Sequence, residues 1–179
     1  PAVGTLTLAQ GDAYVTAPAN VLLTLTSGEV VDTVTLSGDL IEAGTYNWLA
    51  KPSSITLTSE QGLKTVRAHL EDAAGNRSEL FLDDIILDSQ APTQVVPLTP
   101  SADLWLSTNT PVLRWTSVAA VTKYELLVDG AAFDIVGTEW QSSVALAEGS
   151  HSWQVRGVDA AGNTSDLHSS FPRSFEIDT

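Results

Sequence analysis

Cysteine is absent from the 179-residue chain, and so is methionine. Without cysteine there is no disulfide, no thiolate nucleophile and no cysteine-bound zinc. No apolar run approaches the roughly 18 residues of a membrane-spanning helix, so we expect no membrane insertion. The first residue is Pro1, and we expect the natural start of the protein to lie elsewhere, in a longer chain.

Basic residues are also scarce. The chain has 8 Lys and Arg against 22 Asp and Glu, which gives a formal net charge of −14. Both halves share the excess: residues 1–90 hold 12 acidic and 4 basic side chains, and residues 91–179 hold 10 and 4. Such a field repels phosphate backbones, so nucleic acid is excluded as an expected partner.

An internal repeat is the strongest feature that is present. Residues 66–78 and 155–165 share Val-Arg, followed by Asp-Ala-Ala-Gly-Asn-x-Ser. Each copy is followed by an apolar segment that ends in Asp-Ser or Asp-Thr. Between the copies Pro92 marks a short, stiff linker. The repeat predicts two domains, residues 1–90 and 91–179, and the similar phase of both chain ends suggests a longer array.

Apolar residues alternate with polar ones along most of the chain. Gly and Pro clusters interrupt the alternation about every 8–12 residues, which is the spacing of β-sandwiches. The pattern predicts an all-β fold of two tandem sandwiches. The inward-facing positions that it predicts are Leu6 and Leu8; Val21, Leu23 and Leu25; Ile55 and Leu57; Val66, Ala68 and Leu70; Tyr124, Leu126 and Val128; Trp153 and Val155.

The sequence resembles two kinds of exported bacterial repeat. Residues 20–25, 62–66 and 72–76 resemble bacterial immunoglobulin-like repeats, and residues 110–115, 124–130 and 149–156 resemble their fibronectin-III-like relatives. The resemblance implies an immunoglobulin-like sandwich for each domain and an extracellular or cell-surface location. Such repeats commonly carry Tyr at the position of His151, where its hydroxyl bonds back to the backbone at a strand corner.

The Asp-Ala-Ala-Gly-Asn segments admit two interpretations. One is a tight turn in which Asp caps the backbone, Gly takes positive φ and Asn tolerates the left-handed conformation. The other is a cation site. If residues 78–87 form one strand of about 33 Å, Asp88 lies at the far end of the first domain, next to Asp159 and Asn163 of the second. Their oxygens would suit Ca²⁺, the candidate cofactor, at the domain junction.

The five tryptophans divide into two groups. Trp115 and Trp153 fall in strand patterns and are predicted to lie in the core, with Trp48 in a similar position. Trp105 and Trp140 sit beside turns, where an exposed indole could stack on a sugar ring or pack at the rim of the sandwich.

Catalytic residues cannot be assembled from the rest. His69, His151 and His168 are far apart and lack partners at the spacing of a metal site or a catalytic triad. Asp83 and Asp84 are neighbours in a predicted strand, so their side chains diverge and cannot act as a glycosidase pair. We therefore expect a chain that is not an enzyme.

Two functions fit these expectations. The first is a non-catalytic structural or adhesive spacer of a bacterial cell-surface or extracellular filament protein. Its partners would be neighbouring repeats, with an extracellular glycan, protein ligand or filament subunit as further candidates. The alternative is a carbohydrate-binding accessory module of a secreted polysaccharide-active enzyme.

Overall fold

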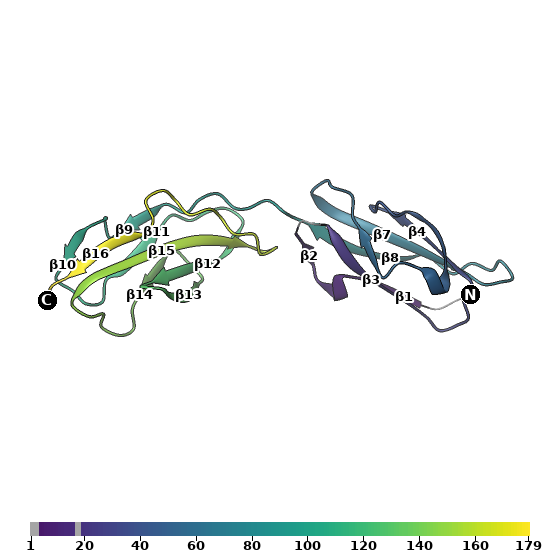
Figure 1. Cartoon of the computed structure of the whole chain (residues 1–179), viewed down its shortest axis with the longest axis horizontal. Helices are drawn as coiled ribbons and strands as arrows, with labels where there is room; N and C mark the ends of the chain where they lie inside the picture. The colour runs from purple at the N-terminus through teal and green to yellow at the C-terminus, as the bar shows by residue number, and fades with distance from the viewer. Residues whose placement is uncertain (1–3, 17–18) are drawn as a thin grey trace. The chain divides into compact units, whose positions relative to one another are not determined.

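Extended backbone dominates the computed structural model, which describes residues 4–16 and 19–179 (Figure 1). Within these residues the helical segments are two three-residue 3-10 turns, η1 (Ala9–Gly11) and η2 (Trp48–Ala50). The described part of the chain holds no helix that is long and apolar enough to cross a membrane. The all-β prediction is confirmed.

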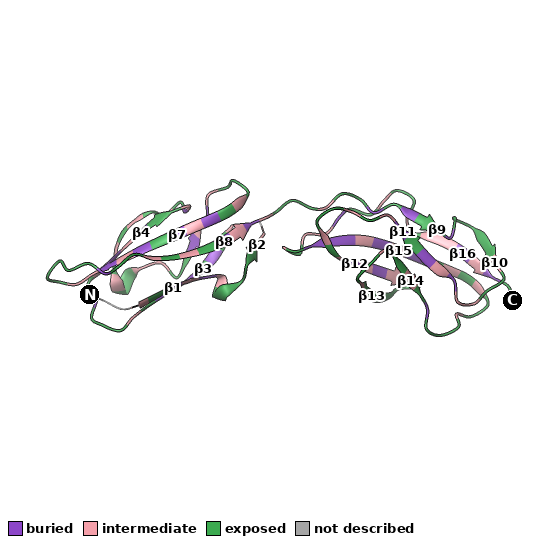
Figure 2. Cartoon of the chain, turned by 180° about the vertical axis from the view of Figure 1, so that it is seen from behind, coloured by how far each residue is buried: buried purple, intermediate pink, exposed green. Residues whose placement is uncertain are grey.

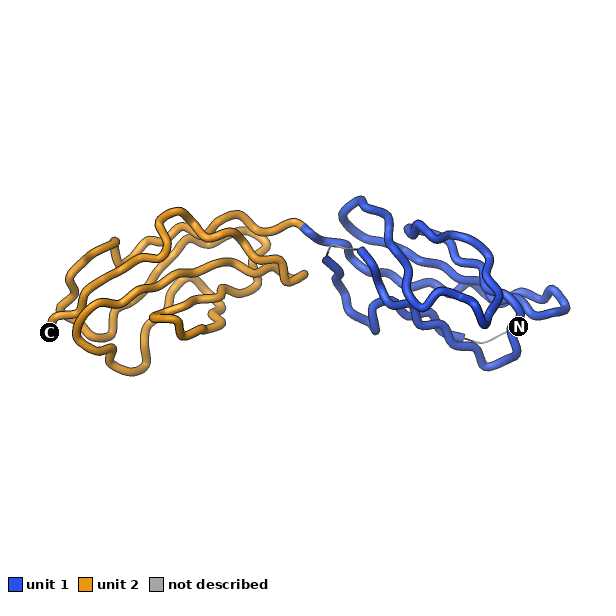
Figure 3. Tube along the Cα trace, viewed as in Figure 1, with its two compact units in different colours: residues 1–89 blue, residues 90–179 orange. Residues whose placement is uncertain are grey.

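The chain divides into two compact units, residues 1–89 and 90–179 (Figure 3). This division is one residue from the predicted boundary between Gln90 and Ala91. The segment from Asp88 to Val96 contains no strand, which fits a short linker with a central proline. Residues 1–3, which the sequence analysis aligned with the linker between the repeats, lie outside the described residues.

The first unit contains two sheets, with strand orders β1-β3-β6 and β2-β8-β7-β4-β5. The longest strand, β7, pairs antiparallel with β4 on one side and β8 on the other. The strands are β1 (Gly4–Leu8), β2 (Tyr14–Val15), β3 (Asn20–Ser27), β4 (Thr33–Gly38), β5 (Gly44–Asn47), β6 (Ser54–Thr56), β7 (Gly62–Glu71) and β8 (Phe81–Leu87).

The second unit repeats this plan with sheets β14-β11-β9 and β10-β16-β15-β12-β13. Its long central strand is β15, which pairs antiparallel with β12 and β16. The strands are β9 (Pro97–Thr99), β10 (Leu104–Leu106), β11 (Val112–Trp115), β12 (Val121–Val128), β13 (Ala131–Ile135), β14 (Glu139–Gln141), β15 (Gly149–Asp159) and β16 (Arg173–Ile177).

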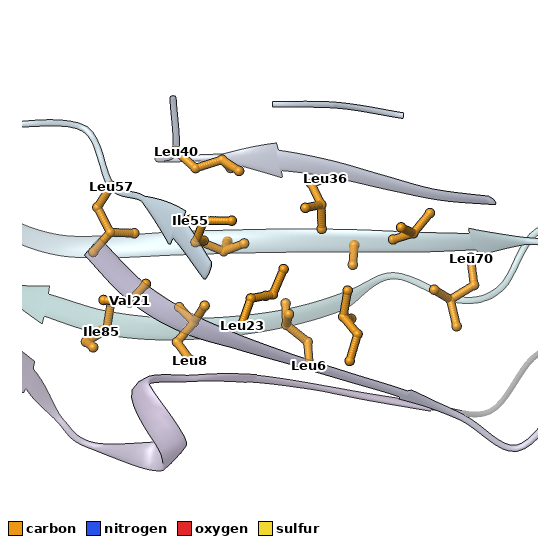
Figure 4. Close-up of a cluster of buried hydrophobic side chains, with 14 of the residues drawn as sticks. Leu6, Leu8, Val21, Leu23, Leu36, Leu40, Ile55, Leu57, Leu70 and Ile85 are labelled. Atoms are coloured by element: carbon orange, nitrogen blue, oxygen red, sulfur yellow. The ribbon is translucent and has the colours of Figure 1, made fainter. Parts of the chain in front are cut away.

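Period-two alternation builds the first core. Every second residue of β3 and β7 is buried, and these residues meet across the two sheets (Figures 2 and 4). Lys64 occupies an inward position of β7 and is buried, and its ammonium group donates a 3.0 Å hydrogen bond to Thr58 Oγ1. The buried Lys64 ammonium group therefore has a polar partner, Thr58, at the edge of this core.

Tryptophan dominates the second core. Trp115 on β11 and Trp153 on β15 are each 1% exposed, and their ring centroids are 6.2 Å apart. Because β11 and β15 belong to different sheets, this pair joins the two layers. The prediction that both indoles are core residues is confirmed.

Two expectations about local structure are wrong. The predicted strand over residues 78–87 begins only at Phe81, because Ser78 is held back against the preceding strand by hydrogen bonds described below. Trp48 lies in η2 rather than in a strand and is half-buried at the edge of the first core, with the Lys51 ammonium 3.9 Å from its ring centroid. The indole there makes a cation–π contact in addition to its packing.

The separate cores yield a stability prediction. Trp153→Ala should lower the free energy of unfolding of the second unit by about 3–5 kcal/mol, because it opens a large cavity between the sheets. Thermal or denaturant unfolding followed for each unit measures this. The exposed Trp105→Ala is the matched control and should change stability by less than about 0.5 kcal/mol. An equal loss of stability in the first unit would contradict the separation of the cores.

Candidate functional site: the repeated turns and the tryptophans

The first repeated turn is closed by the carboxylate of Asp72, which directly follows β7. Asp72 Oδ1 accepts hydrogen bonds from the backbone N–H groups of Ala74 (2.9 Å) and Asn76 (3.0 Å). Asp72 Oδ2 accepts a third, from the side-chain amide of Asn76 at 2.9 Å. The hydrogen bonds from the side chain and backbone of Asn76 hold the pKa of Asp72 below its usual value.

The second turn has the same hydrogen bonds. Asp159 Oδ1 accepts from the N–H groups of Ala161 (2.9 Å) and Asn163 (2.8 Å), and Oδ2 accepts from the Asn163 side-chain amide (3.0 Å). Asp159 is only 7% exposed, so these donors replace the water that its carboxylate would otherwise bind. The repeated sequence therefore encodes a repeated turn, as the first interpretation predicted.

The backbone of the turns differs from the prediction at one point. Gly75 and Gly162 take the expected positive φ, of 82° and 87°. Asn76 and Asn163 are not among the positive-φ residues, so the left-handed role assigned to Asn is wrong. The Asn side chain is instead needed as a donor to the carboxylate four residues earlier.

A serine fastens each turn to the strand before it. The Ser78 hydroxyl accepts from the Leu70 N–H (2.9 Å), and the Ser78 N–H donates to the Leu70 carbonyl (2.8 Å). Ser165 makes the same two bonds with Gly157, at 3.0 and 2.9 Å. Both serines are buried, so each hydroxyl satisfies a backbone group that water cannot reach.

The predicted calcium ligands belong to different units. Asp88 follows β8 in the first unit, and its N–H donates to the Val15 carbonyl at 3.0 Å. Asp159 and Asn163 belong to the second unit, where they bond to each other. Within residues 4–16 and 19–179, no three His, Cys, Asp or Glu side chains form a group that could hold a metal ion. The calcium site, which relies on Asn163 and on both units, stays a prediction.

The two tryptophans proposed for sugar stacking lie in different sheets of the second unit. Trp140 is on β14 and is half-buried against the core, with its ring centroid 5.1 Å from that of Phe133. Trp105 is on β10, at the edge of the other sheet, and is 68% exposed. Both residues lie in three-residue strands next to a turn or bend, as expected, and of the two only Trp105 offers an open indole face.

At the strand corner, where related repeats commonly carry Tyr, the imidazole of His151 makes the contact with the backbone. His151 Nε2 lies 2.9 Å from the Ala147 carbonyl oxygen, and Nδ1 lies 2.6 Å from Asp129 Oδ2. Sequence reasoning missed Asp129 as a partner, because the two residues meet only when β12 and β15 pair. Since both neighbours accept hydrogen bonds, the doubly protonated imidazolium satisfies both contacts.

This geometry changes the pKa of His151. Burial lowers the pKa, but the hydrogen bonds to Asp129 and Ala147, together with the negative charges of Asp129 and Glu176, raise it above the usual value. The ring also stacks on Phe175, with centroids 5.4 Å apart. The Asp129–His151 pair resembles a catalytic dyad in composition, but its outer nitrogen is occupied by a backbone carbonyl rather than a nucleophile.

The two adjacent aspartates diverge, as the strand pattern predicts. Asp83 is half-buried and its Oδ2 accepts from the Leu8 N–H at 2.7 Å, whereas Asp84 is exposed. Asp83 therefore links β8 to the first strand of the unit.

Substitutions in the second turn test its structural role. Asp159→Ala and Ser165→Ala should each destabilise the second unit by about 1–3 kcal/mol, because buried backbone or amide donors lose their acceptor. Urea unfolding of the whole chain measures this, with the exposed Asp166→Ala as the matched control. A destabilisation no larger than that of Asp166→Ala would show that the turn holds without its carboxylate.

The His151 corner predicts a pH dependence. A pKa that is raised on folding stabilises the second unit fully below the unfolded value of about 6.5, and the effect is lost as pH rises through the folded pKa. The urea midpoint of the second unit should therefore fall as the pH rises above about 6.5. His151→Gln should remove this fall, whereas His168→Gln should retain it. The same fall in His151→Gln as in the wild type would refute the assignment.

Comparison with known proteins gives structural matches only. No protein-family model matches the chain, and no curated protein matches it. The fibronectin(III)-like modules of CbhA from Clostridium thermocellum match with a TM-score of 0.64 at 17% identity, over 97% of this chain and 93% of that one. Chicken CNTN1 FN1–FN3 domains match with a TM-score of 0.52 at 12% identity, over 93% and 68%.

A third match is a 1.5-MDa bacterial ice-binding adhesin, with a TM-score of 0.44 at 15% identity over 100% of this chain and 66% of that one. The first two matches establish the fold. The chain folds as a tandem pair of β-sandwiches with the fibronectin-III-like, immunoglobulin-like fold.

Proposed function

We propose that the chain is a non-catalytic structural spacer of a longer extracellular protein, with neighbouring modules of the same chain as its first partners. The observation that carries the proposal is the path of the chain within each unit. In each one the backbone enters at one end of the sandwich and leaves at the other (Figure 1). A module with its two ends apart transmits tension and adds length.

In the first unit this path is fixed by strand register. Gly4 begins β1 beside Leu70, at the end of β7, whereas Leu87 ends β8 opposite Gly62, at the start of β7. The ten-residue β7 therefore separates entry from exit, a span of about 30 Å.

In the second unit, too, the chain enters at one end of the sandwich and leaves at the other. Gln94 contacts the Leu167 carbonyl, in the loop that follows β15, while Ile177 ends β16 opposite Gly149, the first residue of β15. The eleven-residue β15 again lies between the two ends of the unit.

Early and late strands of each unit pair in parallel. In the first unit β2 pairs with β8. The Ile86 N–H donates a 3.0 Å hydrogen bond to the Ala13 carbonyl, and the Asp88 N–H donates one of 3.0 Å to the Val15 carbonyl. In the second unit β10 pairs with β16. Beside this pair, the Asp103 N–H donates to the Ser174 carbonyl (2.8 Å) and the Asp178 N–H donates to the Leu106 carbonyl (3.0 Å). Tension along the chain loads these bonds in shear, so several must break together.

Chemistry at the candidate residues supports a non-catalytic role. Both carboxylate oxygens of Asp72 and Asp159 accept bonds from their own turns, and both His151 nitrogens bond to fold elements. Extracellular location, bacterial surface display and the binding of Ca²⁺ are part of this proposal. The alternative of a carbohydrate-binding accessory module has one specific observation in its favour, the exposed indole of Trp105.

Force spectroscopy on the whole chain tests the spacer function. We expect two separate unfolding events, each releasing roughly 30 nm of chain. Val15→Pro interrupts β2 and should lower the unfolding force of the first unit alone, because proline cannot donate to the ladder. Val30→Pro is the matched control, because Val30 is exposed and lies in a loop outside the strands, and it should leave the unfolding force unchanged.

The event of the second unit serves as an internal reference in the same trace. Unfolding of the first unit at an unchanged force in Val15→Pro would contradict the load-bearing role of the β2–β8 pair.

A further inference from the structure

The exposed indole of Trp105 stands on an ordered surface. Trp105 is the central residue of β10, the edge strand of the five-stranded sheet. Its neighbour Leu106 packs against the core, so the Trp105 side chain points to the opposite, outer face of the sheet. An indole that is 68% exposed leaves a large, flat apolar ring open to solvent.

Strand register places polar groups in line with this ring. Trp105 is paired with Glu176 of β16, and Glu176 is paired with Ser150 of β15. Phe175 and Ile177, on either side of Glu176, are buried, which puts Glu176 on the outer face. The three residues thus form one row across three adjacent strands, about 4.8 Å from strand to strand.

A second row lies beside the first. Ser174 of β16 is paired with Ser152, and its hydroxyl bonds to the Asp103 carboxylate, just before β10. Asp103 and Ser174 join the first row in lining a shallow cavity of about 340 Å³, to which Phe175 also contributes. Besides Trp105 and Phe175, the residues that line this cavity are two serines and two acidic residues.

This combination fits a sugar ring. One face of a pyranose presents C–H groups that pack on an indole. Its equatorial hydroxyls point sideways, where carboxylates can accept hydrogen bonds from them and serine hydroxyls can donate or accept. A protein-binding patch centred on tryptophan would instead be depleted of charge at its centre. Since Asp103 and Glu176 are both acidic, the cavity disfavours uronic acids and other anionic sugars.

We propose that Trp105, Glu176, Ser150, Ser174 and Asp103 form a binding site for one residue of a neutral, pyranose-based glycan. Trp105 supplies the stacking platform, and Glu176 and the serines orient the hydroxyl groups. The site is open at the edge of the sheet, so it admits an internal residue of a long glycan as readily as its end. It does not depend on the spacer function, because the inward faces of β10 and β16 maintain the sandwich.

The test uses the whole chain and four neutral probes: cellohexaose, xylohexaose, mannohexaose and chitohexaose. Calorimetric titration should detect at least one of them with a Kd of about 1 mM or tighter. In a two-dimensional ¹H–¹⁵N spectrum the same probe should shift the indole N–H signal of Trp105, identified by its loss in Trp105→Phe. The buried indoles of Trp115 and Trp153 should not shift.

Matched variants separate this site from adventitious binding. Trp105→Ala should weaken binding at least about tenfold, Glu176→Ala should weaken it by a smaller factor, and Trp140→Phe, on the other sheet, should leave it unchanged. Trigalacturonic acid should bind more weakly than the best neutral probe.

Two results would overturn the proposal. One is the absence of binding by all four neutral probes at about 10 mM, and the other is binding that Trp105→Ala leaves intact. Neither result bears on the spacer function, which force spectroscopy tests separately.

Discussion

A carboxylate that closes a turn is the interaction on which both units depend. After the longest strand of each unit the chain must reverse, and at the second reversal Asp159 is almost fully buried. Such a charge is tolerated only when it is fully hydrogen-bonded, and the turn supplies three donors. In each turn of the repeat, Asp thus supplies the hydrogen-bond acceptor, Gly takes the positive φ, and Asn supplies a side-chain amide donor.

The fixed turn sets the position of everything that follows it. The serine two residues beyond Asn bonds back to the long strand, which directs the chain into β8 or β16. Those last strands pair in parallel with β2 and β10, and in the proposed spacer function this pairing bears the tension. In the second unit, β16 also carries Glu176 and Ser174, so the register of the β10–β16 pair also aligns the polar groups beside Trp105.

Sequence periodicity was sufficient for the cores but not for the surface. Alternation identified Trp115 and Trp153 as buried because a strand exposes only two faces, and the repeated motif located the turns. The burial of Trp140 and the exposure of Trp105 depend on neighbours from distant strands, which periodicity does not report. The Asp129 contact of His151 has the same origin, and the start of β8 at Phe81 reflects the serine bonds.

Amide hydrogen exchange at the second turn tests the central claim most directly. If the Asp159 carboxylate holds the turn, the N–H groups of Ala161 and Asn163 open only with the second unit and exchange as slowly as the core of β15. In Asp159→Ala these two amides should exchange orders of magnitude faster than in the wild type. Rapid exchange of both amides in the wild type, at the rate of the linker residues 90–94 while β15 stays protected, would contradict the account.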